Sequence, residues 1–396
     1  MPHFLASAVV AGELAVLFVG ATMPSPLYPS YAADFGFGGV TLTLIYATYV
    51  VGNLGALLLA GRLSDQIGRR QAILPALGLA IASALVFLFA QSTAWLYPAR
   101  ILSGLATGLG SAAATAWLAE LQPRDRRPAA ALQATMANFL GIAAGPLVAG
   151  LLADLAPWPL RLPYIVYLAP LIIAIPALWA APETVKRRAS GWAELELRPR
   201  LGVPRQIRVD FLPPAVTAFV TFALIGFYAA LVPSLLRDSV RIQSPAVSGG
   251  IICGLFVVAA LVARFSRTLG ARAAMLCGLA VLPPSVALLI GAQVTGSLSL
   301  LLVATLSAGI AAALGYRGSL QVVNEIAPAQ QRGEVVSTYL IAVYLGNSVP
   351  IIGVGLLAAY TTPIFADLMF AIILAVLAGA AWVGERAGIA HVKAAE

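Results

Sequence analysis

Twelve long apolar segments recur along this sequence and constrain its fold more than any other feature. Each is close to the roughly 20 residues that a helix needs to cross the apolar core of a bilayer. Only 10% of the residues are charged, whereas soluble proteins carry roughly a quarter. We therefore predict an all-α polytopic membrane protein with twelve transmembrane helices. The predicted spans are 7–29, 41–60, 72–91, 95–118, 129–152, 163–182, 213–233, 246–265, 272–291, 297–319, 335–359 and 363–384.

The positively charged residues predict the orientation of these spans. If the N-terminus is inside, 19 of the 24 Lys and Arg residues lie in cytoplasmic segments, and only Arg161, Arg237 and Arg241 lie in outer connections. Positive residues are enriched in cytoplasmic loops, so we expect both termini in the cytoplasm. The formal net charge of +8 then reflects orientation in the lipid bilayer, and no nucleic acid is expected as a partner.

The sequence predicts two pseudo-symmetric six-helix bundles. The polar segment 183–212 divides the spans six and six, as a cytoplasmic linker between an N-terminal bundle at 1–182 and a C-terminal bundle at 213–396. A repeated pattern supports a duplication. Glu120, Pro123 and Arg127 have the same spacing as Glu325, Pro328 and Arg332, at a constant offset of 205 residues.

Two related six-helix halves are a known plan of secondary transporters, with the substrate site between the halves near the midplane. A membrane enzyme or scaffold and a sensing receptor are the alternatives. An enzyme would need clustered metal ligands or nucleophiles at membrane depth, but the two histidines, His3 and His391, lie at the termini. A receptor would need a long signalling extension, which neither terminus supplies. We expect no catalytic residues, no metal and no cofactor, and we expect transport driven by an ion or substrate gradient, since no Gly-Lys-Ser/Thr phosphate-binding motif occurs.

The segment "GRLSDQIGRRQAIL", between the second and third spans, places an aspartate between two glycines and ahead of two arginines. Glycines permit a tight turn, and the aspartate can accept charge-assisted hydrogen bonds. The pattern closely resembles the signature loop of the major facilitator superfamily. The residues that carry this resemblance are Gly61, Asp65, Gly68, Arg69 and Arg70.

The resemblance implies a gating role for this loop. Asp65 would help to hold the cytoplasmic side shut, and Glu120 and Arg127 would brace the cytoplasmic end of the first half. The corresponding loop of the second half, "RFSRTLGARAA", keeps Gly270 but lacks the aspartate. We therefore expect an asymmetric gate.

The fifth span contains "GIAAGPLVAG", which resembles the antiporter motif of this superfamily. The matching residues are Gly141, Gly145, Pro146 and Gly150, although Ala149 stands where a further glycine is common. Small residues four apart let helices approach closely. Ordinary small-residue packing is the alternative explanation. In its motifs the chain is most similar to the 12-helix drug–proton antiporters.

The fourth span contains Arg100, four residues before Gly104 and eight before Gly108. This spacing resembles the superfamily's fourth-helix arginine motif, although Ser103 replaces the usual glutamine. A charge in hydrocarbon is costly, so Arg100 is expected to face the interior, where it would assist proton coupling or hold an anionic substrate. The alternative is that Arg100 snorkels to the nearby outer surface.

Two acidic residues, Glu13 and Asp367, lie clearly inside apolar spans. Glu13 is about two turns from the cytoplasmic end of the first span and is a candidate proton carrier, because burial disfavours the charged form of a carboxyl. A structural carboxyl is the alternative. Asp367 is within about one turn of the outer end of the last span, and we predict that it is solvated. Glu13 and Arg100 should differ in depth by about 15 Å, so a direct pair between them is not expected.

Other polar residues at membrane depth are candidates for the lining of a substrate cavity. They are Tyr46, Tyr49, Asn53, Asn138, Tyr228, Tyr339, Tyr344 and Asn347. Together with the resemblance, they favour proton-coupled export of small amphipathic molecules, including multidrug efflux, by a monomer in the bacterial inner membrane. The alternative is proton-coupled uptake of a small organic solute, possibly an anion.

Overall fold

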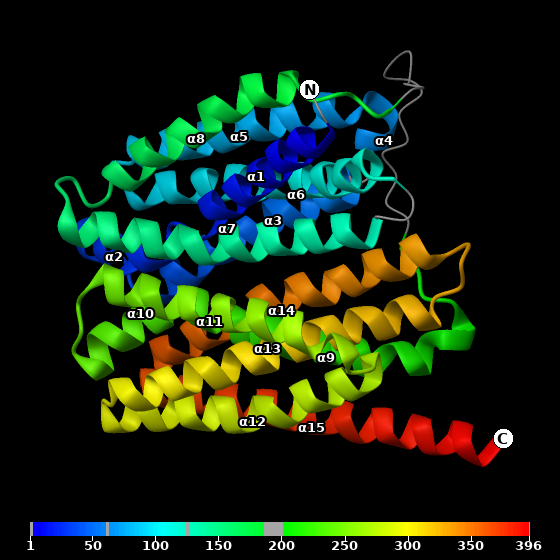
Figure 1. Ribbon diagram of the computed structural model, residues 1–396. Coiled ribbons are helices and arrows are strands. Elements are labelled where there is room, and N and C mark those ends of the chain that lie inside the picture. The colour runs from blue at the N-terminus through cyan, green and yellow to red at the C-terminus, as the bar shows by residue number, and fades with distance from the viewer. Residues whose placement is uncertain (1–2, 61–62, 124–126, 186–200, 396) are drawn as a thin grey trace. The chain divides into compact units, whose positions relative to one another are not determined.

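The computed structural model describes the chain except for residues 1–2, 61–62, 124–126, 186–200 and 396 (Figure 1). The described residues are almost entirely helical and contain no strand. Twelve of their helical segments are long and apolar enough to cross a membrane, which confirms the predicted fold class. Large apolar side chains such as Ile172, Ile173 and Val303 are about half exposed or more, as expected for surfaces that face lipid.

The helices of the first part of the chain alternate with short connections. They are α1 His3–Thr22, α2 Tyr28–Phe35, α3 Gly39–Ala60, α4 Leu63–Ile67, α5 Arg69–Leu88, α6 Thr93–Leu121, α7 Arg127–Leu155 and α8 Leu162–Trp179. The predicted span over 7–29 falls within one candidate membrane span, His3–Phe35, in which α1 stops at Thr22 and the 3₁₀ turn Ser25–Leu27 follows. Pro24 and Pro26 explain the break, because proline has no N–H to continue a helix.

The second part of the chain has the same helical character. Its helices are α9 Arg208–Ala230, α10 Val232–Leu235, α11 Pro245–Phe265, α12 Ala271–Thr295, α13 Leu298–Ile326, α14 Arg332–Tyr360 and α15 Pro363–Ala395. A short π-helical segment, η5, covers Leu236–Val240 between α10 and α11.

The chain forms two compact units. Unit 1 comprises Met1–Phe37, Thr48–Pro199 and Ser244–Cys253, and unit 2 comprises Gly38–Ala47, Arg200–Gln243 and Gly254–Glu396. In unit 1, α1 packs against α6 and α7, and α5 packs against α6 and α8. In unit 2, α12 packs against α13 and α15, while α9 packs against α13, α14 and α15.

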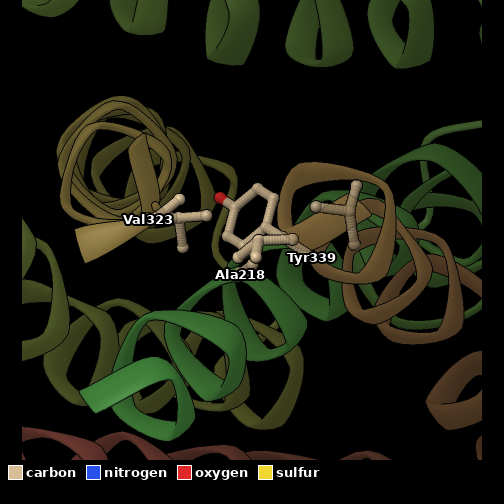
Figure 2. Close-up of a cluster of buried hydrophobic side chains, with 6 residues drawn as sticks. Ala218, Val323 and Tyr339 are labelled. Carbon is tan, nitrogen blue, oxygen red and sulfur yellow. The ribbon is translucent and has the colours of Figure 1, made fainter. Parts of the chain in front are cut away.

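Part of the core of unit 2 is a cluster of buried side chains from α9, α13 and α14. Figure 2 shows the Tyr339 ring beside Ala218, with its hydroxyl directed toward the helix that carries Val323. Tyr339 is fully buried, and its hydroxyl lies 2.8 Å from Ser319 Oγ on α13. Burying a tyrosine is favourable when its hydroxyl has a partner. Tyr339, predicted as a cavity-lining residue, therefore contributes to the packing of unit 2.

Candidate functional site

Glu13 occupies the interior of unit 1. It lies on α1 and is only 2% exposed, and neither carboxylate oxygen has a hydrogen-bond partner among the described residues. Gly110 of α6 faces it, since a Cβ built at Gly110 would lie 3.4 Å from Glu13 Oε1 and 3.2 Å from the Cβ of Ala76 on α5. A buried ionised carboxylate without a partner is costly. The position therefore suits a group that carries a proton.

A small polar-lined cavity begins one helical turn along α1 from Glu13. Its volume is about 10 Å³, which is roughly the space for one water molecule. Leu17 and Gly20 line it from α1, while Ser103 and Thr107 line it from α6 and Tyr167 from α8. The cavity therefore places polar groups and space for water one helical turn from Glu13.

Arg100 is held inside unit 1 and does not reach out to solvent. It is 2% exposed, and its Nη1 donates a hydrogen bond to the Ala21 carbonyl of α1 at 2.7 Å. Its guanidinium lies 4.6 Å from the centre of the Tyr49 ring on α3, a geometry that attracts a cation to the ring face. Ala21 is eight residues beyond Glu13, about 12 Å along α1 at the usual helical rise.

The glycines that follow Arg100 bring α3 close to α6. A Cβ at Gly104 would overlap the Tyr49 carbonyl, and one at Gly108 would lie 2.6 Å from the Asn53 carbonyl. Only small residues allow backbones this close. The close approach places the Tyr49 ring next to Arg100, and Asn53 Nδ2 donates to the Tyr49 hydroxyl at 2.9 Å.

Arg69 is the centre of an ion-pair network in unit 1. The short helix α4 places Asp65 four residues before it, and the two side chains form an ion pair. The Arg69 guanidinium also donates to Glu120 on α6, at 3.1 Å from Nε to Oε2 and 2.5 Å from Nη2 to Oε1, and to Ser64 Oγ at 2.7 Å. Arg69 is only 5% exposed. Its buried charge is balanced by the carboxylates of Asp65 and Glu120. Gly61 and the side chain of Arg127 lie outside the described residues.

Glu183, at the start of the predicted linker, binds the backbone next to this network. Its carboxylate accepts the backbone N–H groups of Arg69 at 3.0 Å and Arg70 at 3.1 Å, at the start of α5. Acidic groups stabilise a helix start, where N–H groups lack partners. Gly68 precedes that start with φ 112°, a conformation that glycine adopts readily. Arg70 donates to the Ala181 carbonyl.

A repeated spacing could have revealed Glu183. It follows Gly68 by the same 115 residues that separate Glu385 from Gly270. Glu385 lies on α15, is 4% exposed, and its Oε1 lies 3.2 Å from Arg272 Nη1 near the start of α12. Each unit thus has a glutamate near the start of a helix that follows a glycine. In unit 1, Glu183 lies at the start of α5, after Gly68, and in unit 2, Glu385 lies near the start of α12, after Gly270.

The antiporter-like motif on α7 makes close helix contacts within unit 1. A Cβ at Gly141 would overlap the Ala15 carbonyl of α1, and one at Gly145 would overlap the Thr22 hydroxyl. A Cβ at Gly150 would overlap the Pro245 carbonyl at the start of α11, a segment that belongs to unit 1. The glycines therefore form two seams, that is, two lines of close helix contact. Gly141 and Gly145 contact α1, and Gly150 contacts the first turn of α11.

Pro146 leaves a carbonyl of α7 without its usual helical donor, because proline has no N–H. That carbonyl belongs to Ile142, four residues earlier. The Thr22 hydroxyl of α1 lies 3.2 Å from it and 3.0 Å from the Phe18 carbonyl of its own helix. A side chain of α1 thus compensates for the proline in α7.

The remaining candidates for a substrate cavity are divided between the units. In unit 2, the Tyr46 hydroxyl donates to Asn347 Oδ1 at 3.1 Å, and both side chains are buried. Tyr228 on α9 is 1% exposed, whereas Tyr344 on α14 and Asn138 on α7 of unit 1 are half-buried. The structure therefore pairs Tyr46 with Asn347 and Tyr49 with Asn53.

The prediction that Asp367 is solvated is wrong. Asp367 is 6% exposed on α15, and its Oδ2 accepts a hydrogen bond of 2.8 Å from Gln293 Nε2 on α12. Gln293 is 5% exposed. Proximity to a helix end did not expose the aspartate, because α12 covers it.

Comparisons with known proteins agree with this architecture. The "Quinolone resistance protein NorA" of Staphylococcus aureus is 25% identical over 245 residues, which cover 60% of this chain and 61% of NorA. The "Sugar transporter ERD6-like 6" of Arabidopsis thaliana is 26% identical over 186 residues, covering 47% of this chain and 37% of that protein. Each alignment spans less than two thirds of the relative.

A solved structure shares the fold over nearly the whole chain. It is a bacterial homologue of the human lysosomal transporter Spinster, in an inward-facing and unoccupied conformation. The TM-score is 0.76 at 17% sequence identity, and the match covers 97% of both chains. The family model described as Major Facilitator Superfamily matches residues 14–349. The predicted resemblance is thereby confirmed, and the chain belongs to the Major Facilitator Superfamily.

Proposed function

We propose that this protein is a proton-coupled antiporter that exports small amphipathic molecules across the bacterial inner membrane by alternating access. The observation that carries the proposal is Glu13, a buried carboxyl whose two oxygens have no hydrogen-bond partner among the described residues. Ionisable residues at membrane depth in transporters are typical of proton relays. Glu13 is the proposed carrier, which binds a proton from one side and releases it to the other.

Two further observations support export. The Gly141, Gly145, Pro146 and Gly150 motif makes close contacts with neighbouring helices, and it resembles the motif of antiporters in this superfamily. The printed name of the relative NorA refers to quinolone resistance. A quinolone is therefore the first compound to test, within a wider panel of amphipathic molecules.

The proposal can be tested in proteoliposomes with an imposed pH gradient. An antiporter moves its substrate toward the acidic compartment while protons leave it, whereas a symporter moves substrate toward the alkaline compartment. This difference does not depend on how the protein is oriented in the vesicle. Protein-free vesicles correct for passive partitioning of weak bases.

Glu13→Gln is the decisive variant. It should lower gradient-driven accumulation at least about tenfold, while exchange of substrate without a gradient continues. Asp34→Asn is the matched control, because Asp34 is an exposed acid in the same unit, and it should behave as wild type. If the Glu13→Gln variant shows undiminished gradient-driven transport, Glu13 is not the proton carrier.

The second candidate function is proton-coupled uptake of a small organic anion. Arg100 favours it, because this cation is buried at membrane depth, where it donates to the Ala21 carbonyl and lies over the Tyr49 ring. A cation in that setting can also attract an anionic group. Uptake predicts accumulation on the alkaline side, and Arg100→Gln would then weaken binding of anionic compounds more than that of neutral ones.

A further inference from the structure

We propose that Asp367 and Gln293 form a second proton-binding site, located in unit 2 and separate from Glu13. The two residues lie near the same end of adjacent helices: Gln293 is two residues before the last residue of α12, and Asp367 is four residues after the first residue of α15. The ligand is a proton, held as the neutral form of the Asp367 carboxyl. The site does not depend on the proposed role of Glu13.

The hydrogen bonding of this pair is incomplete when the aspartate is ionised. Gln293 Nε2 donates to Asp367 Oδ2 at 2.8 Å. The other end of the same amide, Gln293 Oε1, is buried and has no hydrogen-bond partner among the described residues. An ionised carboxylate can only accept hydrogen bonds, so it cannot satisfy that oxygen.

A neutral aspartic acid can complete the pair. Its carbonyl oxygen accepts from the amide N–H, and its hydroxyl donates to the amide oxygen, so one acid and one amide exchange two hydrogen bonds. Leaving a buried acceptor unsatisfied is destabilising. The pair therefore gains a hydrogen bond when the proton is bound.

The surroundings supply little charge that would favour the ionised form. Helices α9, α12 and α14 pack against α15, and Phe227 of α9 stacks on Phe370 of α15 with ring centres 4.9 Å apart. At this end of the unit, the titratable side chains of these helices are Tyr228 of α9 and the exposed Tyr360 of α14. From Pro363 to Ala378, α15 itself has no ionisable residue except Asp367.

The charged segment η5 packs against α12. It carries Arg237 and Asp238, and it is followed by Arg241. Arg237 Nε lies 2.9 Å from Asp238 Oδ1, so these two charges offset each other. Among the described residues, Asp367 has no ion-pair partner, and Gln293 is its hydrogen-bonding neighbour.

Infrared spectroscopy of the purified protein in lipid tests the proposal directly, since neutral carboxylic acids have a C=O band that carboxylates lack. At mildly acidic pH, the wild type should show a neutral-acid band that shifts in D₂O, weakens as the pH is raised and is lost in Asp367→Asn. Glu13→Gln is the matched control and should keep that band. If the Asp367→Asn difference appears only among the carboxylate bands, the proposal is wrong, and the proposed antiport by Glu13 is unaffected.

Two further variants test the pairing. Gln293→Leu removes the amide, so the neutral-acid band of Asp367 should move to higher frequency as its C=O loses a donor. An unchanged frequency would contradict the proposed pair.

The thermal midpoint of unfolding gives a second test. Asp367→Asn offers both a donor and an acceptor to Gln293 and should keep the thermal midpoint of the wild type, whereas Asp367→Leu should lower it. A loss of stability in Asp367→Asn as large as that in Asp367→Leu would also contradict the neutral pair.

Discussion

Arg69 and Glu120 are joined by two hydrogen bonds, from Nε to Oε2 at 3.1 Å and from Nη2 to Oε1 at 2.5 Å. The planar guanidinium matches the carboxylate in a way that a lysine ammonium cannot. This contact links the start of α5 to the end of α6, and the same guanidinium pairs with Asp65. One buried side chain thus fixes the ends of three helices of unit 1.

Arg69→Lys should lower the free energy of unfolding by about 1.5–3 kcal/mol, because it removes charge-assisted hydrogen bonds while keeping the charge. The measurement is equilibrium unfolding in mixed detergent micelles. Arg267→Lys is the control, since Arg267 is exposed in unit 2 and its substitution should change stability by less than about 0.5 kcal/mol. Equal stability of the two variants would mean that the two-bond geometry is unimportant.

Asp65→Asn should slow transport about tenfold, which corresponds to about 1.4 kcal/mol in the barrier. Asp65 pairs with Arg69 at the predicted cytoplasmic gate and is not one of the candidate cavity-lining residues. Substrate affinity measured in detergent should therefore remain close to that of the wild type. A large loss of affinity would argue that Asp65 acts on substrate binding.

Gly141→Ala should destabilise unit 1 by about 1–3 kcal/mol through overpacking. The new Cβ would overlap the Ala15 carbonyl and lie 2.8 Å from the Cβ of Phe18, and a helix backbone cannot move aside easily. Gly12→Ala is the matched control on α1, because nothing lies within 4 Å of a Cβ there. That control should be neutral or stabilising by up to about 1 kcal/mol. Thermal unfolding in detergent distinguishes the two, and identical midpoints would contradict the proposed seam.

Tyr339→Phe should cost about 1 kcal/mol in the free energy of unfolding, since it removes the hydrogen bond between the Tyr339 hydroxyl and Ser319. Transport should continue at the wild-type rate, because this hydroxyl is engaged inside the core of unit 2. Tyr360→Phe, at a position that is 87% exposed, should leave both quantities unchanged. If Tyr339→Phe instead weakens substrate binding without loss of stability, its hydroxyl faces the substrate.

The helices could be predicted from the sequence because spans in a bilayer are set by local composition. The first span was predicted, but the 3₁₀ turn inside it was not, since the apolar run continues through Pro24 and Pro26 while the regular α-helix does not. The burial of Asp367 could not be predicted, because it depends on Gln293, 74 residues away in the sequence. Glu183 was missed for a similar reason: it binds backbone N–H groups at the start of α5, and the 115-residue spacing that it shares with Glu385 is a weak signal without the structure.

The contact between Thr22 and the carbonyl opposite Pro146 has an evolutionary consequence. The hydroxyl at position 22 is useful because proline at position 146 leaves the Ile142 carbonyl without a helical donor. Pro146→Ala would restore an N–H to that carbonyl, and Thr22→Val should then cost less than it does beside the proline. Positions 22 and 146 should therefore co-vary among relatives. Relatives without a proline at position 146 should more often lack a hydroxyl at position 22.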